Sequence, residues 1–131
     1  MQCRQEIGTR EHPIVAVVDD DESVRESLPD LIREFGFAAH AFSSAEAFLA
    51  SDIVSQTRCL VLDIAMPGMS GLDLQRELKG RETGIPVIFI TAQKEEALRE
   101  RAFEQGAAGF LPKPFSDTSL LEALNAALQL S

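Results

Sequence analysis

The sequence predicts an α/β fold in which a parallel sheet lies between two layers of helices, a three-layer doubly wound sandwich. Five short apolar runs, beginning near residues 14, 37, 59, 86 and 108, alternate with amphipathic stretches. Each strand and helix together take about 20 to 30 residues, which is the length of a right-handed crossover between parallel strands. The runs are continuously apolar rather than alternating, which is typical of strands covered on both faces.

The length and composition fit one globular domain. A chain of 131 residues with 45% hydrophobic and 25% charged residues can bury a core, but it has no room for two full domains. We expect residues 1 to 12 to form a flexible leader and residues 13 to 131 to form the domain. The cysteines, Cys3 and Cys59, are expected to be reduced thiols, the second of them a core residue.

Charge and hydropathy exclude several classes of function. The 12 Lys and Arg residues against 21 Asp and Glu residues give a net charge of -9. We therefore expect no direct nucleic acid binding by this chain and no membrane association. No apolar run reaches the roughly 18 to 20 residues of a membrane span, and the first dozen residues lack the apolar centre of a secretory signal. A cytoplasmic location follows as an expectation.

The first strand is expected at residues 14 to 18, and an amphipathic helix follows it. The apolar stripe of that helix consists of Val24, Leu28, Leu31, Ile32 and Phe35. Gly36 is expected to end the helix, because glycine readily adopts the left-handed backbone found there. Pro29 lies inside the stripe and should bend the helix near its second turn.

The remaining units repeat this alternation. Ser43 and Glu46 have the spacing of a capping box at the start of a short second helix. Later strands are expected at residues 37–42, 59–62, 86–91 and 108–111, and later helices at residues 72–79, 94–105 and 117–130. The highly charged helix at 94–105 offers only Leu98, Ala102 and Phe103 as anchors.

Residues with reactive or metal-binding side chains follow the strands. In a doubly wound sheet the ligand site lies beyond the carboxyl ends of the strands. Those ends carry Asp19 and Asp20, Asp63, Thr91 and Lys113. Three neighbouring carboxylates repel one another, so they call for a hard cation, and Mg²⁺ suits such oxygen ligands. A hydroxyl and an ammonium group are suited to holding the free oxygens of a phosphoryl group.

These residues resemble the receiver domain of two-component response regulators. The resemblance runs from Ile14 to about Leu128, through VVDDDES, LDIAMPGMSG, ITA and GFLPKPF. The intervals also fit, with 43 residues from Asp20 to Asp63, 28 more to Thr91 and 22 more to Lys113. The segments GFLPKPF and SSAEAFLA are similar to those of FixJ-type regulators. Single pieces are weak signals, but five on the expected strand ends are specific.

The resemblance implies a flavodoxin-like, CheY-like sheet of order 2-1-3-4-5 with five helices. It implies a phosphorylation-activated signalling switch that catalyses only its own phosphorylation and dephosphorylation. A sensor histidine kinase would donate the phosphoryl group, and an output domain or partner, in transcription regulation, would respond. The face formed by the fourth helix and fifth strand, residues 94 to 110, would change and could form a homodimer.

The resemblance also assigns a phosphoacceptor and a metal site. Asp63 would accept the phosphoryl group as a carboxylate nucleophile. Asp20 and Asp63 would bind Mg²⁺ directly, Asp19 would bind it through water, and the backbone carbonyl of Ala65 would complete the protein ligands. Ala65 cannot reach an attacking water, whereas Gln93 can form hydrogen bonds; in the family these two positions tune phosphoryl lifetime.

Further roles fall on the last two strands. By resemblance, Lys113 would contact the phosphoryl oxygens, and the bond between Lys113 and Pro114 would be cis. Thr91 and Phe110 would form the switch, in which the hydroxyl moves toward the phosphoryl group while the aromatic ring turns inward.

Ordinary structural roles stay open for the same residues: capping for Asp19 and Asp20, a turn for Asp63, strand or core packing for Thr91 and Phe110, and a solvated surface for Lys113. Capping needs one carboxylate rather than two, and we expect Asp21 and Glu22 to supply it. The pair is therefore better explained by a metal site.

Other functions on this fold are disfavoured by single features. A flavin-binding electron carrier needs a phosphate cradle after the first strand, where this chain has the acidic run DDDE. An aspartyl phosphatase needs a second acid two residues after the nucleophile, where this chain has Ala65. A phosphate-independent pseudo-receiver would not need a complete acidic site. The chain could be an excised receiver or a stand-alone regulator.

Overall fold

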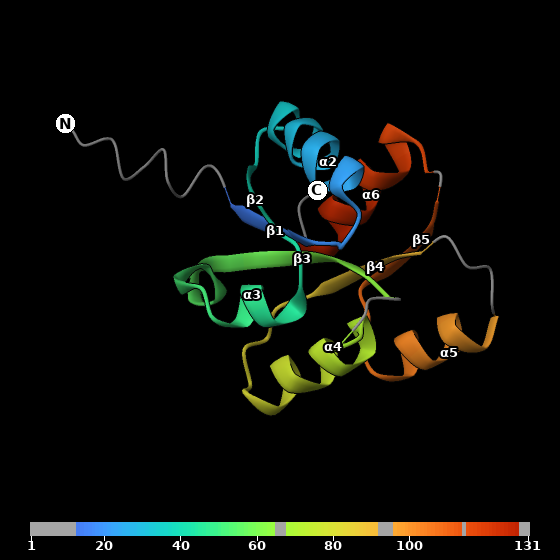
Figure 1. The fold of residues 1–131 in the computed structure, drawn as a ribbon. Coiled ribbons are helices and arrows are strands. Elements are labelled where there is room, and N and C mark those ends of the chain that lie inside the picture. The colour runs from blue at the N-terminus through green and yellow to red at the C-terminus, as the bar shows by residue number, and fades with distance from the viewer. Residues whose placement is uncertain (1–12, 65–67, 92–95, 114, 129–131) are drawn as a thin grey trace.

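A computed structural model describes residues 13–64, 68–91, 96–113 and 115–128. The strands are β1 (Ile14–Val18), β2 (Ala38–Phe42), β3 (Thr57–Asp63), β4 (Val87–Thr91) and β5 (Gly109–Pro112). The helices are α2 (Glu22–Glu34), α3 (Ala45–Leu49), α4 (Gly71–Gly80), α5 (Glu96–Glu104) and α6 (Asp117–Leu128), with a short 3-10 helix η1 (Asp52–Gln56). Figure 1 shows the expected three layers.

The strands form one parallel sheet of order β2-β1-β3-β4-β5, which confirms the expected topology. The strand order reverses between β1 and β3: β2 lies on one side of β1, whereas β3, β4 and β5 lie on the other side. In this register Val18 pairs with Leu62, and Thr91 pairs with Pro112. The residues that follow β1, β4 and β5 therefore meet the end of β3 at one edge of the sheet.

Both faces of the sheet are buried, which explains why its strands do not alternate. On one face α2 and α6 pack against the sheet, and Leu28, Ile32, Leu120 and Leu124 are buried there. On the other face α3, α4 and α5 cover the sheet, and Phe48, Leu74 and Leu78 are buried there (Figure 1). Each central strand contributes alternate side chains to the two cores, so nearly every strand residue is apolar.

The ends of α2 follow the sequence expectation. Asp21 is its N-cap and accepts hydrogen bonds from the backbone N–H of Ser23 at 3.0 Å and from its hydroxyl at 2.8 Å. Gly36 follows the helix with a φ of 98°, the left-handed conformation for which glycine is suited. Pro29 is buried inside the helix, and the bend at this residue stays a prediction.

The expected capping box of the second helix is wrong by one residue. The N-cap of α3 is Ser44, whose hydroxyl accepts a hydrogen bond from the N–H of Ala47 at 3.0 Å. Because this register puts Ala47 at the third helical position, Glu46 cannot close the box with Ser43. The Glu46 carboxylate instead accepts a hydrogen bond from the N–H of Met69 at 3.3 Å.

A reciprocal capping box does occur, at the start of α4. The hydroxyl of Ser70 accepts from the N–H of Asp73 at 3.2 Å, and the Asp73 carboxylate accepts from the N–H of Ser70 at 3.3 Å. The sequence predicts the start of this helix at residue 72, and it does not predict the capping box. The box fixes the point at which the chain leaves the loop and enters the helix.

Other differences concern the lengths of elements and one anchor. The strand β3 begins at Thr57 rather than at residue 59, and η1 at Asp52–Gln56 was not expected. In α5, Ala102 is fully buried as expected, but Phe103 is 42% exposed and is not a core anchor. The side chain of Leu98, the residues of the expected leader and Cys3 lie outside the described part of the chain.

Two findings bear on the expected thiols and membrane character. Cys59 is a free cysteine in the core, and its burial raises the pKa of its thiol to about 12. This residue is therefore an inert core filler, as expected. Among the residues that the structure describes, no helix combines the length and the apolar character needed to cross a membrane.

Candidate functional site

Three carboxylates meet at the carboxyl edge of the sheet, as the sequence predicted. Asp19 follows β1, Asp20 comes next, and Asp63 is the last residue of β3. One carboxylate oxygen of each residue lies within 4.8 Å of the others. Asp19 is fully buried and Asp63 is 7% exposed, whereas Asp20 is exposed.

The chemistry of this cluster fits a divalent cation with a preference for oxygen. Two buried carboxylates and a third at the surface repel one another strongly in a medium that screens poorly. A hard cation such as Mg²⁺ binds one or two protein carboxylates and keeps several waters, so the exposed position of Asp20 leaves room for such waters. The donor set therefore fits Mg²⁺.

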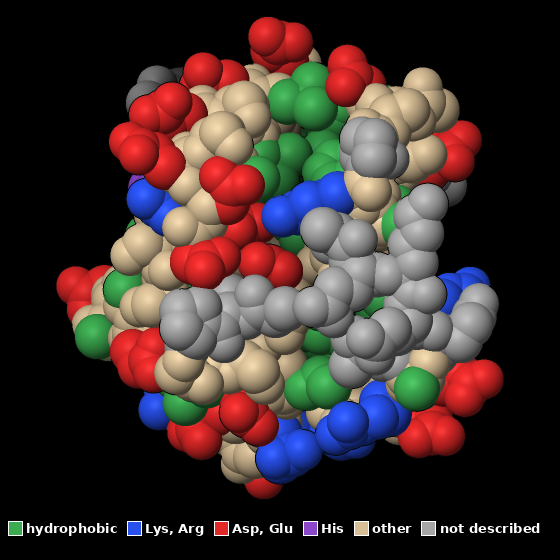
Figure 2. Space-filling model, turned by 45° about the vertical axis from the view of Figure 1, so that its right-hand side comes forward, with side chains coloured by type: hydrophobic (Ala, Val, Ile, Leu, Met, Phe, Trp, Pro, Cys, Tyr) green, Lys and Arg blue, Asp and Glu red, His purple; other side chains and the backbone are tan. Residues whose placement is uncertain are grey.

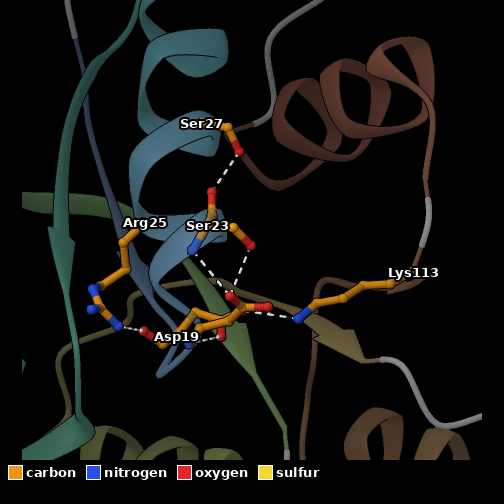
Figure 3. A network of polar contacts seen from close by, with 6 residues as sticks. Asp19, Ser23, Arg25, Ser27 and Lys113 are labelled. Carbon is orange, nitrogen blue, oxygen red and sulfur yellow. Dashed lines mark hydrogen bonds and ion pairs between the residues drawn. The ribbon is translucent and has the colours of Figure 1, made fainter.

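A lysine that follows β5 already balances part of this charge. The ammonium Nζ of Lys113 lies 3.1 Å from Oδ2 of Asp19, and the Lys113 side chain is 23% exposed (Figure 3). The backbone N–H of Lys113 donates to the carbonyl of Thr91 at 2.7 Å, which holds this residue beside the end of β4. A partly exposed cation thus lies beside the acid cluster.

Asp19 is held on several sides. Its Oδ1 accepts a hydrogen bond from the N–H of Asp21 at 2.8 Å, and its own N–H donates to the carbonyl of Phe42 at 3.1 Å. The guanidinium of Arg25 donates to the carbonyl oxygen of Asp19 at 3.0 Å (Figure 3). These contacts fix the backbone and the carboxylate of Asp19 independently of any ligand.

Sequence reasoning did not single out Arg25. One signal could have identified it, because a cation near the start of a helix is disfavoured by the helix dipole and therefore suggests a specific partner. Arg25 lies in the second turn of α2, four residues after the N-cap Asp21. Its positive charge, like that of Lys113, lowers the electrostatic cost of gathering carboxylates at this edge.

Gly71 is a second residue whose role the sequence did not reveal. A Cβ atom at this position would lie 2.6 Å from the carbonyl oxygen of Asp63 and 2.8 Å from Cα of Ile64. The N–H of Gly71 donates to the carbonyl of Ile64 at 3.2 Å. The first turn of α4 therefore packs directly on the backbone of Asp63, a contact that only glycine permits.

The remaining predicted site residues occupy two neighbouring strands. Thr91 is 1% exposed at the end of β4, on the same edge as the acid cluster. Phe110 on β5 is partly buried against the core beneath α5, with its ring centroid 6.4 Å from that of Phe103. The structure brings Thr91 to the site, whereas Phe110 lies on the side of the sheet covered by α5.

Three positions named from the sequence lie outside the described residues: Ala65, Gln93 and Pro114. The expected carbonyl ligand and the expected cis peptide bond therefore stay predictions. Around the site, Figure 2 shows many acidic side chains on one face of the molecule, with basic side chains beside some of them. This distribution agrees with the net charge of -9.

Comparisons with known proteins agree with this geometry. The profile of the family described as the response regulator receiver domain matches residues 15–125. Nodulation protein W of Bradyrhizobium diazoefficiens is 47% identical over 116 residues, which cover 88% of this chain and 51% of that protein. The transcriptional regulatory protein FixJ of Azorhizobium caulinodans is 42% identical over 114 residues, covering 87% of this chain and 54% of FixJ.

The fold comparison gives the same result. A low-resolution structure of the response regulator StyR superposes with a TM-score of 0.83 at 49% identity, covering 91% of this chain and 60% of StyR. The chain spans about half the length of the curated relatives that it matches.

Proposed function

This chain belongs to the response regulator receiver family, and on that premise we propose that Asp63 is the residue that accepts the phosphoryl group. The family makes the chain a phosphoryl-accepting signalling domain and sets aside the flavoprotein and phosphatase alternatives. We choose Asp63 as the acceptor because of its position: it is the last residue of β3, is nearly buried and belongs to the carboxylate cluster. We assign residues 13 to 131 to this domain.

The proposed reaction is the transfer of a phosphoryl group to a carboxylate. A carboxylate oxygen of Asp63 forms a bond to phosphorus, and the bond between phosphorus and the histidine nitrogen of the donor breaks. The electron pair of the broken bond stays on that nitrogen, and Asp63 becomes an acyl phosphate. The proposed donor is a sensor histidine kinase, since receiver domains of this family take their phosphoryl group from such kinases.

Lys113 and Thr91 are placed to assist this transfer. We propose that the ammonium of Lys113, 3.1 Å from Asp19 in the present structure, turns to an oxygen of the phosphoryl group. The hydroxyl of Thr91, at the end of the adjacent strand β4, is the proposed donor to another oxygen. Both groups would stabilise the negative charge on the phosphoryl oxygens during the transfer.

The cation that would occupy the cluster is Mg²⁺. Asp20 and Asp63 are the proposed direct ligands, with Asp19 acting through water and the carbonyl of Ala65 as a further ligand. When bound, Mg²⁺ supplies positive charge that offsets the repulsion between Asp63 and the incoming phosphoryl group. The buried carboxylates of Asp19 and Asp63 fit this role, because they are held at the edge of the sheet by their strands.

The proposed response to phosphorylation is a change of the face formed by α5 and β5. Movement of the Thr91 hydroxyl toward the phosphoryl group would let Phe110 turn inward. Support comes from α5, where, among the side chains that the structure describes, Ala102 is buried and Phe103 is 42% exposed. We propose that this face forms a homodimer in the phosphorylated state and controls an output domain or partner.

The proposed biological role is transcription regulation in the cytoplasm. The relatives described above include a transcriptional regulatory protein, and the length of the relatives leaves room for an output domain that this chain does not span. The net charge of -9 supports a regulatory rather than a DNA-binding role for this domain.

The function is tested with a small phosphodonor. Wild-type protein incubated with acetyl phosphate and Mg²⁺ should gain the mass of one phosphoryl group, and base should remove it. Asp63→Ala should show no gain, whereas Asp30→Ala, which removes an exposed carboxylate of α2, should be labelled like wild type. Undiminished labelling of Asp63→Ala would contradict the assignment, and absence of labelling in wild type would favour a pseudo-receiver.

The switch is tested by sedimentation with and without beryllofluoride, which mimics the bound phosphoryl group. We expect the analogue to increase self-association, or to change amide exchange, in the segment from α5 to β5. A Phe103→Ala variant should lose the association while keeping phosphorylation, because Phe103 is exposed and lies far along the chain from Asp63. No change in either measurement would contradict the switch.

A further inference from the structure

A carboxylate of α3 reaches the backbone just before α4. Glu46 lies in the first turn of α3, and its Oε2 accepts a hydrogen bond from the backbone N–H of Met69 at 3.3 Å. The same oxygen lies 3.2 Å from the position that a Cβ atom on Gly68 would take. Gly68 has a φ of 75°, a conformation that glycine adopts readily. Because Gly68 has no side chain, the Glu46 carboxylate can lie directly against the backbone of this segment.

The backbone that Glu46 contacts continues to the acceptor aspartate. Met69 precedes the N-cap of α4, and Gly71 is the first residue of that helix. The N–H of Gly71 donates to the carbonyl of Ile64 at 3.2 Å, and a Cβ on Gly71 would lie 2.6 Å from the carbonyl oxygen of Asp63. The N–H that Glu46 holds therefore lies close along the chain to the contact between α4 and the acceptor.

The surroundings of Glu46 indicate a role in hydrogen bonding rather than in packing or ion pairing. Helices α3 and α4 cover the same face of the sheet (Figure 1), where Ala45 and Phe48 bury α3. Glu46 itself is exposed, so it adds nothing to the core. Within the described parts of the chain, the ion pairs join other residues. The carboxylate of Glu46 thus contacts backbone and not a cation.

We propose that Glu46 is a positioning residue for Asp63. Its carboxylate holds the N–H of Met69 and thereby keeps the first turn of α4 packed on the backbone of the acceptor. The inference rests on the proposed roles of Asp63 as phosphoacceptor and metal ligand. Because the backbone of Asp63 sets how its carboxylate lies relative to Asp19 and Asp20, this contact raises both the Mg²⁺ affinity and the rate of phosphoryl acceptance.

A glutamine variant separates this role from two that depend on charge. An acidic residue in the first turn of a helix stabilises the helix dipole, and a carboxylate near a metal site attracts the cation. Both effects need the negative charge of Glu46. Positioning needs an acceptor oxygen, which Glu46→Gln keeps while it loses the charge. Glu46→Ala removes the acceptor as well.

The test measures Mg²⁺ affinity by calorimetric titration of the unphosphorylated protein. Glu46→Ala should weaken Mg²⁺ binding by about threefold to tenfold, the range expected for the net contribution of one hydrogen bond. Glu46→Gln should stay within about twofold of wild type. Glu34→Ala is the matched control, because it removes an exposed carboxylate at the other end of α2 from the acid cluster and should leave the affinity unchanged.

Two further measurements follow the same variants. Amide hydrogen exchange in metal-free protein should be faster at the N–H of Met69 in Glu46→Ala and nearly unchanged in Glu46→Gln. Labelling by acetyl phosphate at saturating Mg²⁺ should be slower in Glu46→Ala than in Glu46→Gln. A merely structural role in α3 would lower the melting temperature of Glu46→Ala and leave its Mg²⁺ affinity and its labelling rate at the wild-type values.

Wild-type Mg²⁺ affinity in Glu46→Ala would overturn the proposal. Equal losses in Glu46→Ala and Glu46→Gln would also overturn it, because they would assign the effect to charge. If wild type is labelled on Asp63 while these results fail, the acceptor stands and the role of Glu46 falls. If the Mg²⁺ pattern holds but wild type is not labelled, Glu46 positions the carboxylate of Asp63 as proposed, and the phosphoacceptor role is the part that fails.

Discussion

The two edges of the same parallel sheet differ in both charge and packing. At the carboxyl edge, Asp19 follows β1, Asp63 ends β3 and Lys113 follows β5; carboxylate oxygens of Asp19 and Asp63 lie within 4.8 Å of each other, and Nζ of Lys113 lies 3.1 Å from Asp19. At the amino edge, a cavity beside β4 is lined by apolar and uncharged polar residues together with one residue of each charge, Lys79 and Glu82. Parallel topology thus concentrates the reactive groups at the carboxyl edge.

The packing of glycine shows the same contrast. At the carboxyl edge, a Cβ on Gly71 would meet the backbone of Asp63 at 2.6 Å. Near the amino edge, Gly80 at the other end of the same helix α4 has no atom within 4 Å of such a Cβ. One helix therefore has a tightly constrained end beside the acceptor and an unconstrained end away from it.

The largest change in stability is expected when the two glycines of α4 are each replaced by alanine. Gly71→Ala should destabilise the protein by about 1 to 3 kcal/mol, because backbone atoms rather than a flexible side chain must move. Gly80→Ala should raise stability by about 0.5 to 1 kcal/mol through its lower unfolded-state entropy and better helix propensity. Urea unfolding of both variants measures the difference. Equal effects of the two substitutions would show that Gly71 is not packed against Asp63.

Removal of the lysine at the carboxyl edge should have the next largest effect. Lys113→Met leaves the fully buried Asp19 without its cation, and should lower metal-free stability by about 1 to 2 kcal/mol. Mg²⁺ should then stabilise the variant more than the wild type, because the cation replaces the lost charge. Lys79→Met, at the rim of the amino edge, should change stability by less than about 0.5 kcal/mol. Thermal melts with and without Mg²⁺ decide between these outcomes.

Magnesium itself should stabilise the unphosphorylated protein. At about ten times its Kd, a ligand that binds only the native state adds roughly 1.4 kcal/mol, which raises the melting temperature by about 4 to 8 °C. Asp20→Asn removes one repelling charge and one ligand, so it should raise the metal-free melting temperature and shrink the Mg²⁺ increment. An Asn variant that keeps the full increment would exclude Asp20 as a ligand.

The smallest effect concerns the helix cap next to the cluster. Hydrogen bonds from the hydroxyl and the N–H of Ser23 lower the pKa of the Asp21 carboxyl below its ordinary value of 3.8. A lowered native pKa contributes stability above pH 3.8, and this contribution is lost as the pH falls through the native pKa. The stability difference between wild type and Asp21→Asn should therefore be constant near neutrality and shrink in acid. A stability difference that grows as the pH falls would contradict a lowered pKa of Asp21 in the native state.

The fold and the charged residues of the site could be predicted because they depend on local patterns. Continuous apolar runs reveal strands buried on both faces, and the topology then brings their ends together. Asp19, Asp20 and Asp63 were found in this way, and their carboxylates meet as expected. The resemblance to receiver domains supplied the roles that the pattern alone could not.

The residues that were missed depend on tertiary approach. Gly71 is important because its backbone packs closely on the backbone of Asp63. Arg25 is important because it donates to the backbone carbonyl of Asp19, a contact that forms only in the folded chain. The capping box failed for a related reason, since Glu46 found a partner in Met69, 23 residues away in sequence.

The central claim is that the carboxyl edge is the phosphorylation site and that Asp63 is its acceptor. The most direct measurement is borohydride reduction of protein treated with acetyl phosphate and Mg²⁺, followed by peptide mass spectrometry. Borohydride converts an acyl phosphate of aspartate to homoserine, so the modified position is read from the sequence ions. We predict homoserine at position 63 and unmodified aspartate at positions 19 and 20. Homoserine at another aspartate, with position 63 intact, would contradict the account.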